Sequence, residues 1–342
     1  DTSLGVLCGL DTTAPDVTIE EKNEVPTIEK TVKDSNDNWV DSNTAKIGDT
    51  VEYKAVITVK TANTNYVMHD TMTDGLTFNK DSVKVTVSGA DVPTTKYTLS
   101  APGTKGETFS IAFDNNYIAS LPADTKIEVT YNAVVNEKAK IDPGANENEA
   151  YLTFGNSQET AHDKTYTYLY QFDLIKYSGT SGKLLGGAQF ILYDAETGGN
   201  EIKLVKDNTT GIYRVATATE IANHNTVDHI ETVPGQTVRI SGLDKKVYWL
   251  DEILPPAGYN DLPGRAKVDL QSGSKTALAD RLTNGYDEAN ASSIGGVPIV
   301  NNAGTTLPGT GGIGTTIFYV VGGGLMVAAA ILLITKKRME NR

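Results

Sequence analysis

Apolar and polar residues alternate with a period of two over most of the chain, in runs of about five to ten positions. Residues 51–59 and 126–135 are examples. Because successive side chains of a strand point to opposite faces, this pattern predicts strands that place one face on a core. Turn-forming pairs such as Ser88-Gly89 and Pro102-Gly103 separate the runs. Many short strands joined by polar turns predict an all-β fold of tandem immunoglobulin-like β-sandwiches.

The length of 342 residues leaves room for two or three domains. The strand pattern predicts one sandwich over residues 25–164 and a second over residues 165–302, with a short helix near residues 217–222. Export would require an N-terminal signal peptide, and the sequence starts at Asp1 without the charged and apolar pattern of one. We therefore expect residues 1–24 to be the remnant of an N-terminal domain and its linker. Residues 303–342 form a tail of different composition.

That tail contains an uncharged apolar stretch at residues 313–335, and four basic residues follow it: Lys336, Lys337, Arg338 and Arg342. At a rise of about 1.5 Å per residue, about twenty apolar residues in a helix span a bilayer. The sequence therefore predicts a C-terminal transmembrane helix. The basic end would stay in the cytoplasm, which places the bulk of the chain outside the cell.

Composition excludes several classes of function. The formal net charge of -13 argues against nucleic-acid binding, which needs basic patches. The single cysteine, Cys8, leaves no disulfide to stabilise an exported protein. The four histidines are scattered without metal-ligand spacing, so we expect no metal and no cofactor. No serine–histidine–acid or paired-carboxylate pattern stands out, so the chain is not expected to be an enzyme.

Polar residues lie in phase with core positions at three places in the second sandwich. The residues are Lys176 after Phe172 and Leu174, Glu252 after Tyr248 and Leu250, and Asn301 after Val297 and Ile299. Burial lowers the pKa of a lysine and raises that of a carboxyl group, so both can be neutral together. A neutral amine is a nucleophile and a protonated carboxyl can polarise an amide. The pattern predicts a Lys176–Asn301 isopeptide bond formed with loss of ammonia and assisted by Glu252.

The first sandwich repeats the pattern. Lys30 is in phase with Ile28 and Val32, Asp70 with Met68, and Asn156 with Leu152 and Phe154. Asn148 lies on the same alternation as Asn156, and Asp74 is a second acid close to Asp70.

These motifs resemble those of Gram-positive pilins. Residues 248–259 are similar to the E-box of their collagen-adhesin B-type domain, with Ile253 and Pro255 in place of a threonine and an alanine. Residues 25–164 resemble the isopeptide-forming middle domain of backbone pilins, in which an aspartate replaces the glutamate. The resemblance implies a Lys30–Asn156 bond with Asp70 assisting, and leaves Asn148 as the alternative acceptor and Asp74 as the alternative acid.

The pentapeptide before the apolar stretch resembles the sorting signal of sortase substrates. It consists of Leu307, Pro308, Gly309, Thr310 and Gly311. The resemblance implies that a sortase cuts between Thr310 and Gly311 and passes the Thr310 carbonyl, through a thioester, to an amine of peptidoglycan or of a lysine on the next subunit. Lys22 stands where backbone pilins carry that lysine, although Glu20 and Glu21 replace the tyrosine and proline of their motif.

Together these features lead us to expect a structural subunit of a sortase-assembled pilus, in the shaft, at the cell wall and surface of a Gram-positive bacterium. Its expected partners are sortase, peptidoglycan, other pilin subunits, the membrane before sorting and a host extracellular ligand. One alternative is a monomeric wall-anchored adhesin whose ligand-binding region lies outside this sequence. Another is a surface enzyme whose catalytic domain lies outside it.

Overall fold

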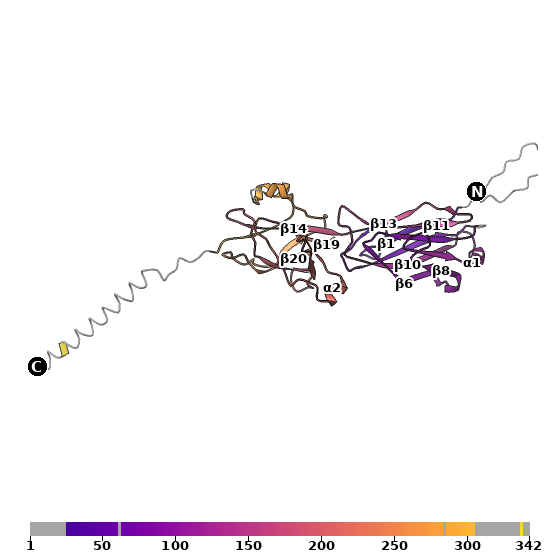
Figure 1. Ribbon diagram of the computed structural model, residues 1–342, viewed down its shortest axis with the longest axis horizontal. Helices are drawn as coiled ribbons and strands as arrows, with labels where there is room; N and C mark the ends of the chain where they lie inside the picture. The colour runs from indigo at the N-terminus through magenta and orange to yellow at the C-terminus, as the bar shows by residue number, and fades with distance from the viewer. Residues whose placement is uncertain (1–24, 61–62, 283–284, 305–335, 338–342) are drawn as a thin grey trace, which may run out of the picture.

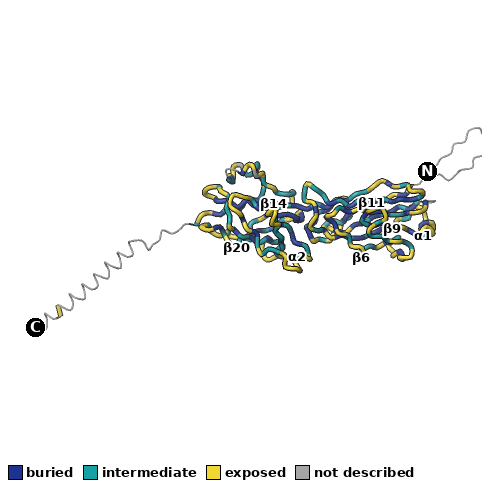
Figure 2. The backbone as a smooth tube through the Cα atoms, in the orientation of Figure 1, coloured by how far each residue is buried: buried dark blue, intermediate teal, exposed yellow. Residues whose placement is uncertain are grey.

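The computed structural model describes residues 25–60, 63–282, 285–304 and 336–337, and within them the protein is all-β, as predicted. Two units follow one another along the long axis of the molecule (Figure 1). The first contains strands β1 to β13 and the second contains strands β14 to β22. Each unit has two sheets whose inner faces share a continuous apolar core, seen as the buried interior in Figure 2.

The first unit pairs a six-stranded sheet with a seven-stranded sheet. The first sheet has the order β2 (Trp39–Val40), β1 (Thr27–Lys33), β4 (Thr50–Thr58), β10 (Lys126–Val135), β6 (Leu76–Val87) and β7 (Ala90–Asp91). The second has the order β3 (Ser42–Thr44), β13 (Asp163–Tyr168), β11 (Asn146–Phe154), β5 (Val67–Met72), β9 (Phe109–Phe113) and β8 (Tyr97–Ser100), with β12 (Gln158–Glu159) on β11. Helices η1 (Thr94–Lys96) and α1 (Asn115–Ser120) lie in connections.

The second unit is smaller and has sheets of five and four strands. The larger sheet has the order β16 (Leu204–Lys206), β17 (Tyr213–Val215), β19 (Val238–Leu243), β14 (Tyr170–Ser178) and β22 (Val297–Asn301). The smaller has the order β18 (Ile230–Glu231), β15 (Gln189–Tyr193), β20 (Val247–Leu254) and β21 (Ala266–Asp269). The helices are α2 (Ala218–Ala222), η2 (Ala279–Leu282), η3 (Glu288–Asn290) and α3 (Ala291–Ile294).

Strand β14 is buried on both faces, unlike a strand at the surface of a sandwich. Its outward residues Ile175 and Tyr177 pack in a second apolar cluster with Leu282, Tyr286 and Ile294, which belong to the helical segment before β22. Asp173 anchors that segment by accepting hydrogen bonds from Arg239 and from the backbone N–H of Ala277. The helical segment is seen beside β14 in Figure 1.

The boundary between the units lies later than predicted. Strand β13 runs to Tyr168 and pairs with β11 and β3, so it belongs to the first unit, whereas the predicted boundary after residue 164 cuts it. Only Leu169 separates β13 from β14. Alternation continues through both strands, so the pattern alone could not locate the change of sheet.

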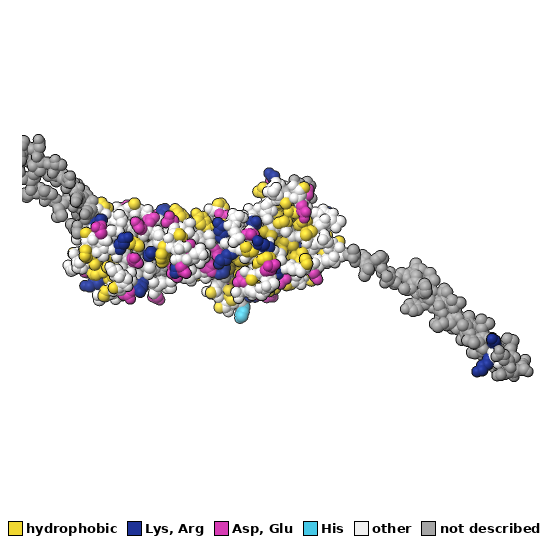
Figure 3. Space-filling view, turned by 180° about the vertical axis from the view of Figure 1, so that it is seen from behind, with side chains coloured by type: hydrophobic (Ala, Val, Ile, Leu, Met, Phe, Trp, Pro, Cys, Tyr) yellow, Lys and Arg dark blue, Asp and Glu magenta, His cyan; other side chains and the backbone are white. Residues whose placement is uncertain are grey.

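The two units are in direct contact at this junction. The backbone N–H of Ile47 donates to the carbonyl of Gly242 at 3.0 Å. Gly242 has a φ of 79°, and a Cβ there would lie 2.5 Å from Cδ1 of Ile47, so only glycine fits. The surface of both units carries acidic and basic side chains interspersed on the face seen in Figure 3.

No helix in the described residues is long and apolar enough to cross a membrane. The predicted membrane-spanning stretch, residues 313–335, lies outside the described part of the chain.

Candidate functional site

The second unit contains a buried cluster of Lys176, Glu252 and Asn301. Lys176 Nζ lies 2.8 Å from Glu252 Oε1 and donates a hydrogen bond to Asn301 Oδ1. The Asn301 amide nitrogen donates to both carboxylate oxygens of Glu252, at 2.9 and 3.1 Å. Lys176 is 1% exposed and Asn301 is 2% exposed, so water is excluded from the three groups.

Strand arrangement explains why these three residues meet. Strands β14 and β22 are parallel neighbours, with Lys176 opposite Ile299 and Ser178 opposite Asn301. Glu252 reaches them from β20 in the facing sheet. The loop after β20 completes the cluster, because the carbonyl of Asn260 accepts from Asn301 Nδ2 at 2.8 Å and the N–H of Leu262 donates to Glu252 Oε2 at 3.1 Å.

The environment shifts Lys176 toward its uncharged form. Burial lowers the pKa of its amine, although the hydrogen bond and charge of Glu252 act in the opposite direction. The Nζ also lies 5.4 Å from the centre of the Phe190 ring, so its surroundings are otherwise apolar. The amine therefore lies in contact with a carboxamide that is also bound to an acid.

The first unit contains a second buried cluster, formed by Lys30, Asp70, Tyr131 and Asn148. Lys30 Nζ lies 2.6 Å from Asp70 Oδ2 and donates to the Tyr131 hydroxyl. The Tyr131 hydroxyl donates to Asp70 Oδ2, and Asn148 Nδ2 donates to the Tyr131 oxygen at 3.4 Å. Lys30 and Tyr131 come from one sheet, on β1 and β10, and Asp70 and Asn148 from the facing sheet, on β5 and β11.

Burial shifts both ionisable partners toward their neutral forms. It lowers the pKa of the Lys30 amine, against the charge and hydrogen bond of Asp70. It raises the pKa of the Asp70 carboxyl, against the same contact with Lys30. The desolvation of two charges works against the ion pair, and this is why both pKa values move toward the neutral forms.

The structure does not bring the predicted acceptor Asn156 to Lys30. Asn156 is exposed in the turn between β11 and β12, whereas the alternative acceptor Asn148 is buried within the cluster. The alternative acid Asp74 is also exposed, in the turn after β5, and Asp70 is the acid in contact with the lysine. The prediction that Asn156 faces Lys30 was wrong, because β11 ends at Phe154 and the alternation of faces does not continue to Asn156.

Sequence reasoning also missed Tyr131. Its phase with Val129 and Ala133 on β10 indicates a core position but does not distinguish it from the buried Tyr53 on β4.

Lys22 and the pentapeptide Leu307, Pro308, Gly309, Thr310 and Gly311 lie outside the described residues.

A third polar group is buried in the first unit. His69 Nδ1 lies 2.6 Å from Glu107 Oε1, and His69 Nε2 lies 3.0 Å from Thr153 Oγ1. This order resembles a nucleophile–base–acid arrangement, but His69 is 1% exposed and Glu107 6% exposed, so a substrate has no access. Glu107 also accepts from the N–H of Lys105, and we attribute to the group the anchoring of the loop before β9.

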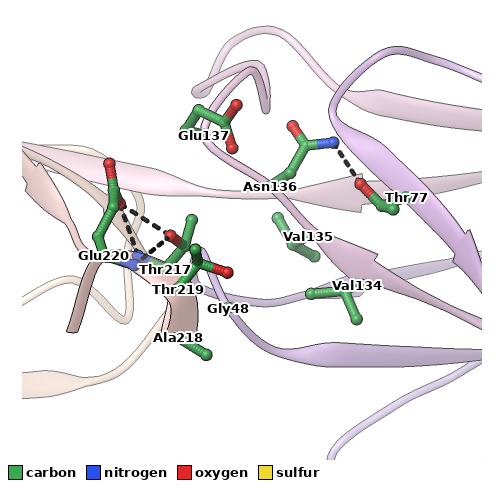
Figure 4. A pocket seen from close by; sticks show the side chains of 10 residues that line it. All are labelled: Gly48, Thr77, Val134, Val135, Asn136, Glu137, Thr217, Ala218, Thr219 and Glu220. Atoms are coloured by element: carbon green, nitrogen blue, oxygen red, sulfur yellow. Dashed lines mark hydrogen bonds between the residues drawn. The ribbon is translucent and has the colours of Figure 1, made fainter. Parts of the chain in front are cut away.

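The cavity at the junction of the two units is separate from both lysine clusters. It has a volume of about 470 Å³ and is lined by Gly48 and residues 134–137 of the first unit and by residues 217–220 of the second (Figure 4). Several of its polar groups are paired with one another, since Thr217 and Glu220 form a capping box at α2 and Asn136 donates to Thr77. Among the described residues, no group of three or more histidine, cysteine or acidic side chains could hold a metal ion.

Comparison with known proteins identifies the C-terminal region first. Residues 299–341 match the family described as the LPXTG cell wall anchor motif. The chain is 26% identical, over 230 residues, to the trypsin-resistant surface T6 protein of Streptococcus pyogenes serotype M6. That alignment covers 57% of this chain and 41% of the T6 protein, so the chain spans less than half the length of this relative.

Two solved structures share the fold over most of both chains. The 35 kDa C-terminal fragment of the major pilin GBS80 of Streptococcus agalactiae matches with a TM-score of 0.57 and 20% identity, over 82% of this chain and 100% of that one. The pilus 2b backbone protein of group B streptococcus matches with a TM-score of 0.53 and 24% identity, over 82% and 99%. The chain therefore carries an LPXTG cell wall anchor motif on the all-β fold found in streptococcal pilus backbone proteins.

Proposed function

We propose that this chain is a structural subunit of a sortase-assembled pilus that is anchored to the peptidoglycan of a Gram-positive cell. Its units would be tandem immunoglobulin-like sandwiches, each closed by an internal lysine–asparagine isopeptide bond. The observation that carries the proposal is the presence of one buried lysine–acid–asparagine cluster in each unit of a chain that ends in an LPXTG anchor motif. The similarity to pilus backbone proteins supports it.

The proposed bonds are Lys176–Asn301 and Lys30–Asn148, the pairs that lie in the two buried clusters. In each, Nζ attacks the Cγ of the asparagine, the Cγ–Nδ2 bond breaks, and ammonia leaves with one proton taken from Nζ. Glu252 and Asp70 would hold and return that proton. Each cluster reacts once, on its own chain, so we infer that the protein is not an enzyme.

The two bonds differ in what they enclose. In the second unit the bond joins its first strand, β14, to its last, β22. Force entering at Tyr170 would pass through Lys176 and Asn301 with residues 177–300 unloaded. In the first unit the bond joins β1 to β11, so β13 lies outside the covalent loop. Such cross-links would replace the disulfides that one cysteine cannot supply.

The anchor supplies the intermolecular chemistry. Sortase would cut between Thr310 and Gly311 and transfer the Thr310 carbonyl to peptidoglycan or to a lysine of another subunit, with Lys22 as the proposed acceptor. Residues 313–335 would form the transmembrane helix that holds the precursor before sorting, ahead of the basic tail. A host extracellular ligand would be a further partner, at the surface of the assembled pilus.

The mass of the intact purified chain tests the internal bonds. A deficit of two ammonia masses, with peptide fragments that join Lys30 to Asn148 and Lys176 to Asn301, is the expected result. A deficit of one would remove the bond whose peptide pair is missing. The full calculated mass would refute the cross-linking part of the proposal.

A monomeric wall-anchored adhesin is the second candidate. It is favoured by the residues before Lys22, since Glu20 and Glu21 stand where the pilin motif has tyrosine and proline. In cells that supply the sortase, Lys22→Arg should abolish a ladder of covalent polymers. A ladder that persists would exclude Lys22, and the absence of any ladder from the unsubstituted chain would favour the monomer.

A further inference from the structure

The two lysine clusters differ in how the acid reaches the asparagine. In the second unit Glu252 contacts both reacting groups, with Lys176 Nζ at 2.8 Å and Asn301 Nδ2 at 2.9 Å. In the first unit the acid is Asp70, whose side chain is one methylene shorter. There the Nδ2 of Asn148 donates to the hydroxyl of Tyr131, at 3.4 Å. A phenol therefore lies beside the leaving nitrogen in addition to the acid, since the Asn148 side chain also acts on the pKa of Asp70.

The Tyr131 oxygen lies between all the groups that would exchange protons. It accepts from Lys30 Nζ and Asn148 Nδ2 and donates to Asp70 Oδ2. Its ring is held by stacking against Tyr53, with centroids 5.6 Å apart, and by an edge contact with Phe109 at 4.9 Å. The hydroxyl is thus fixed by packing, in a site without solvent, next to the nucleophile, the acid and the leaving group.

We propose that Tyr131 is a catalytic residue that relays a proton from Asp70 to the leaving nitrogen of Asn148 during formation of the first cross-link. The inference rests on the proposed Lys30–Asn148 bond. The protonated Asp70 gives its proton to the Tyr131 oxygen while Tyr131 gives its hydroxyl proton to Nδ2. The carboxylate left on Asp70 takes one proton from Nζ as Nζ bonds to Cγ. The Cγ–Nδ2 bond breaks, ammonia leaves, and the acid and the phenol end as they began.

The electrostatics of the cluster agree with this route. Burial raises the pKa of Tyr131 far above its ordinary value, which keeps the phenol protonated before the reaction. Asp70 Oδ1 and Asn148 Oδ1 are buried and accept no hydrogen bond from the described residues. The carbonyl oxygen of the Asn148 amide is therefore not held by another hydrogen-bond donor among those residues.

The test compares the rates of both cross-links within one molecule. Full-length chain is recovered unfolded from inclusion bodies, refolded by dilution and quenched in acid at intervals. Digestion and mass spectrometry then measure each linked peptide pair. In Tyr131→Phe, which keeps the ring, the Lys30–Asn148 bond should form about 100-fold or more slowly, the usual contribution of general acid–base catalysis. The Lys176–Asn301 bond should form at its usual rate.

Two further variants separate chemistry from packing. Tyr53→Phe is the matched control, because the Tyr53 hydroxyl makes no hydrogen bond to Lys30, Asp70 or Asn148 in the described structure. In this variant the Lys30–Asn148 bond should form at an unchanged rate. Adding Asp70→Glu to Tyr131→Phe should restore much of the rate, since a glutamate can contact both groups as Glu252 does. A purely structural role for the hydroxyl would give no such rescue.

The outcomes distinguish the relay from the bond itself. An unchanged rate in Tyr131→Phe overturns the relay and leaves the proposed bond standing. Failure of Asp70→Glu to rescue a slow Tyr131→Phe also counts against the relay. If the unsubstituted chain never links Lys30 to Asn148, the proposed bond fails and the relay fails with it.

Discussion

Replacing Glu252 by glutamine should leave the shape of the second unit intact and remove its cross-link. The amide can still accept from Lys176 and lie against Asn301, but it cannot hold and return the proton that leaves Nζ. The bond would close a loop of 125 residues, for which the chain-entropy model gives about 5 kcal/mol of stabilisation. For a unit of this size, that free energy corresponds to a fall in melting temperature of about 10–20 °C.

Calorimetry of the full chain provides the assay and an internal reference. The transition of the second unit should move to lower temperature in Glu252→Gln while that of the first unit stays, and mass spectrometry should show one ammonia retained. The double variant Lys176→Met with Glu252→Gln also lacks the bond but has no buried amine. The difference between the two variants isolates the cost of burying Lys176 without an acidic partner, which can reach about 3–5 kcal/mol. A Glu252→Gln chain that still loses the ammonia, or that melts with the parent although uncross-linked, would refute the reasoning.

Three other predictions follow from the structure. In Asn148→Ala, where Lys30 and Asp70 remain unreacted, the raised pKa of Asp70 contributes stability that is complete below its ordinary value of 3.8 and is lost as the pH rises through the folded value. The lowered pKa of Lys30 makes a contribution that is complete above 10.5 and is lost as the pH falls toward its folded value. Urea unfolding over a pH series should therefore give this variant a lower free energy of unfolding between pH 3.8 and pH 10.5 than below or above that range. A free energy of unfolding that rises steadily from about pH 4 to about pH 7 would contradict this prediction. When the chain is pulled from its two ends, the cross-linked second unit should not extend, whereas the first should release residues 149–168, about 20 residues or about 70 Å of extended chain. A gain in length that corresponds to unfolding of the whole first unit would exclude the Lys30–Asn148 bond. Gly242→Ala should destabilise the junction by about 1–3 kcal/mol more than Gly258→Ala, because both have positive φ but only the first meets Ile47; equal melting temperatures for the two variants would contradict this.

Strand parity in the sequence was enough to place most of the buried polar residues. Lys30, Asp70, Lys176 and Asn301 all alternate in phase with apolar neighbours, and all four are buried. The side chain of Glu252 is buried as well, as its phase with Tyr248 and Leu250 predicts. The reason is local: on a strand, each residue takes its face from its neighbours, so the alternation is a reliable guide wherever the strand continues.

The tertiary structure decided which of these residues meet. Asn148 and Asn156 have the same parity, but β11 ends at Phe154, and the pairing of Ala150 with Asp70 sets Asn148 beside the acid. The role of Tyr131 and the position of β13 depend likewise on how distant strands pair. The alternation and motifs of the sequence determined the all-β class, the candidate lysines and the anchor. Register between strands far apart in the chain determined which asparagine and which hydroxyl lie in the cluster of Lys30, because such contacts arise from packing that a local pattern does not encode.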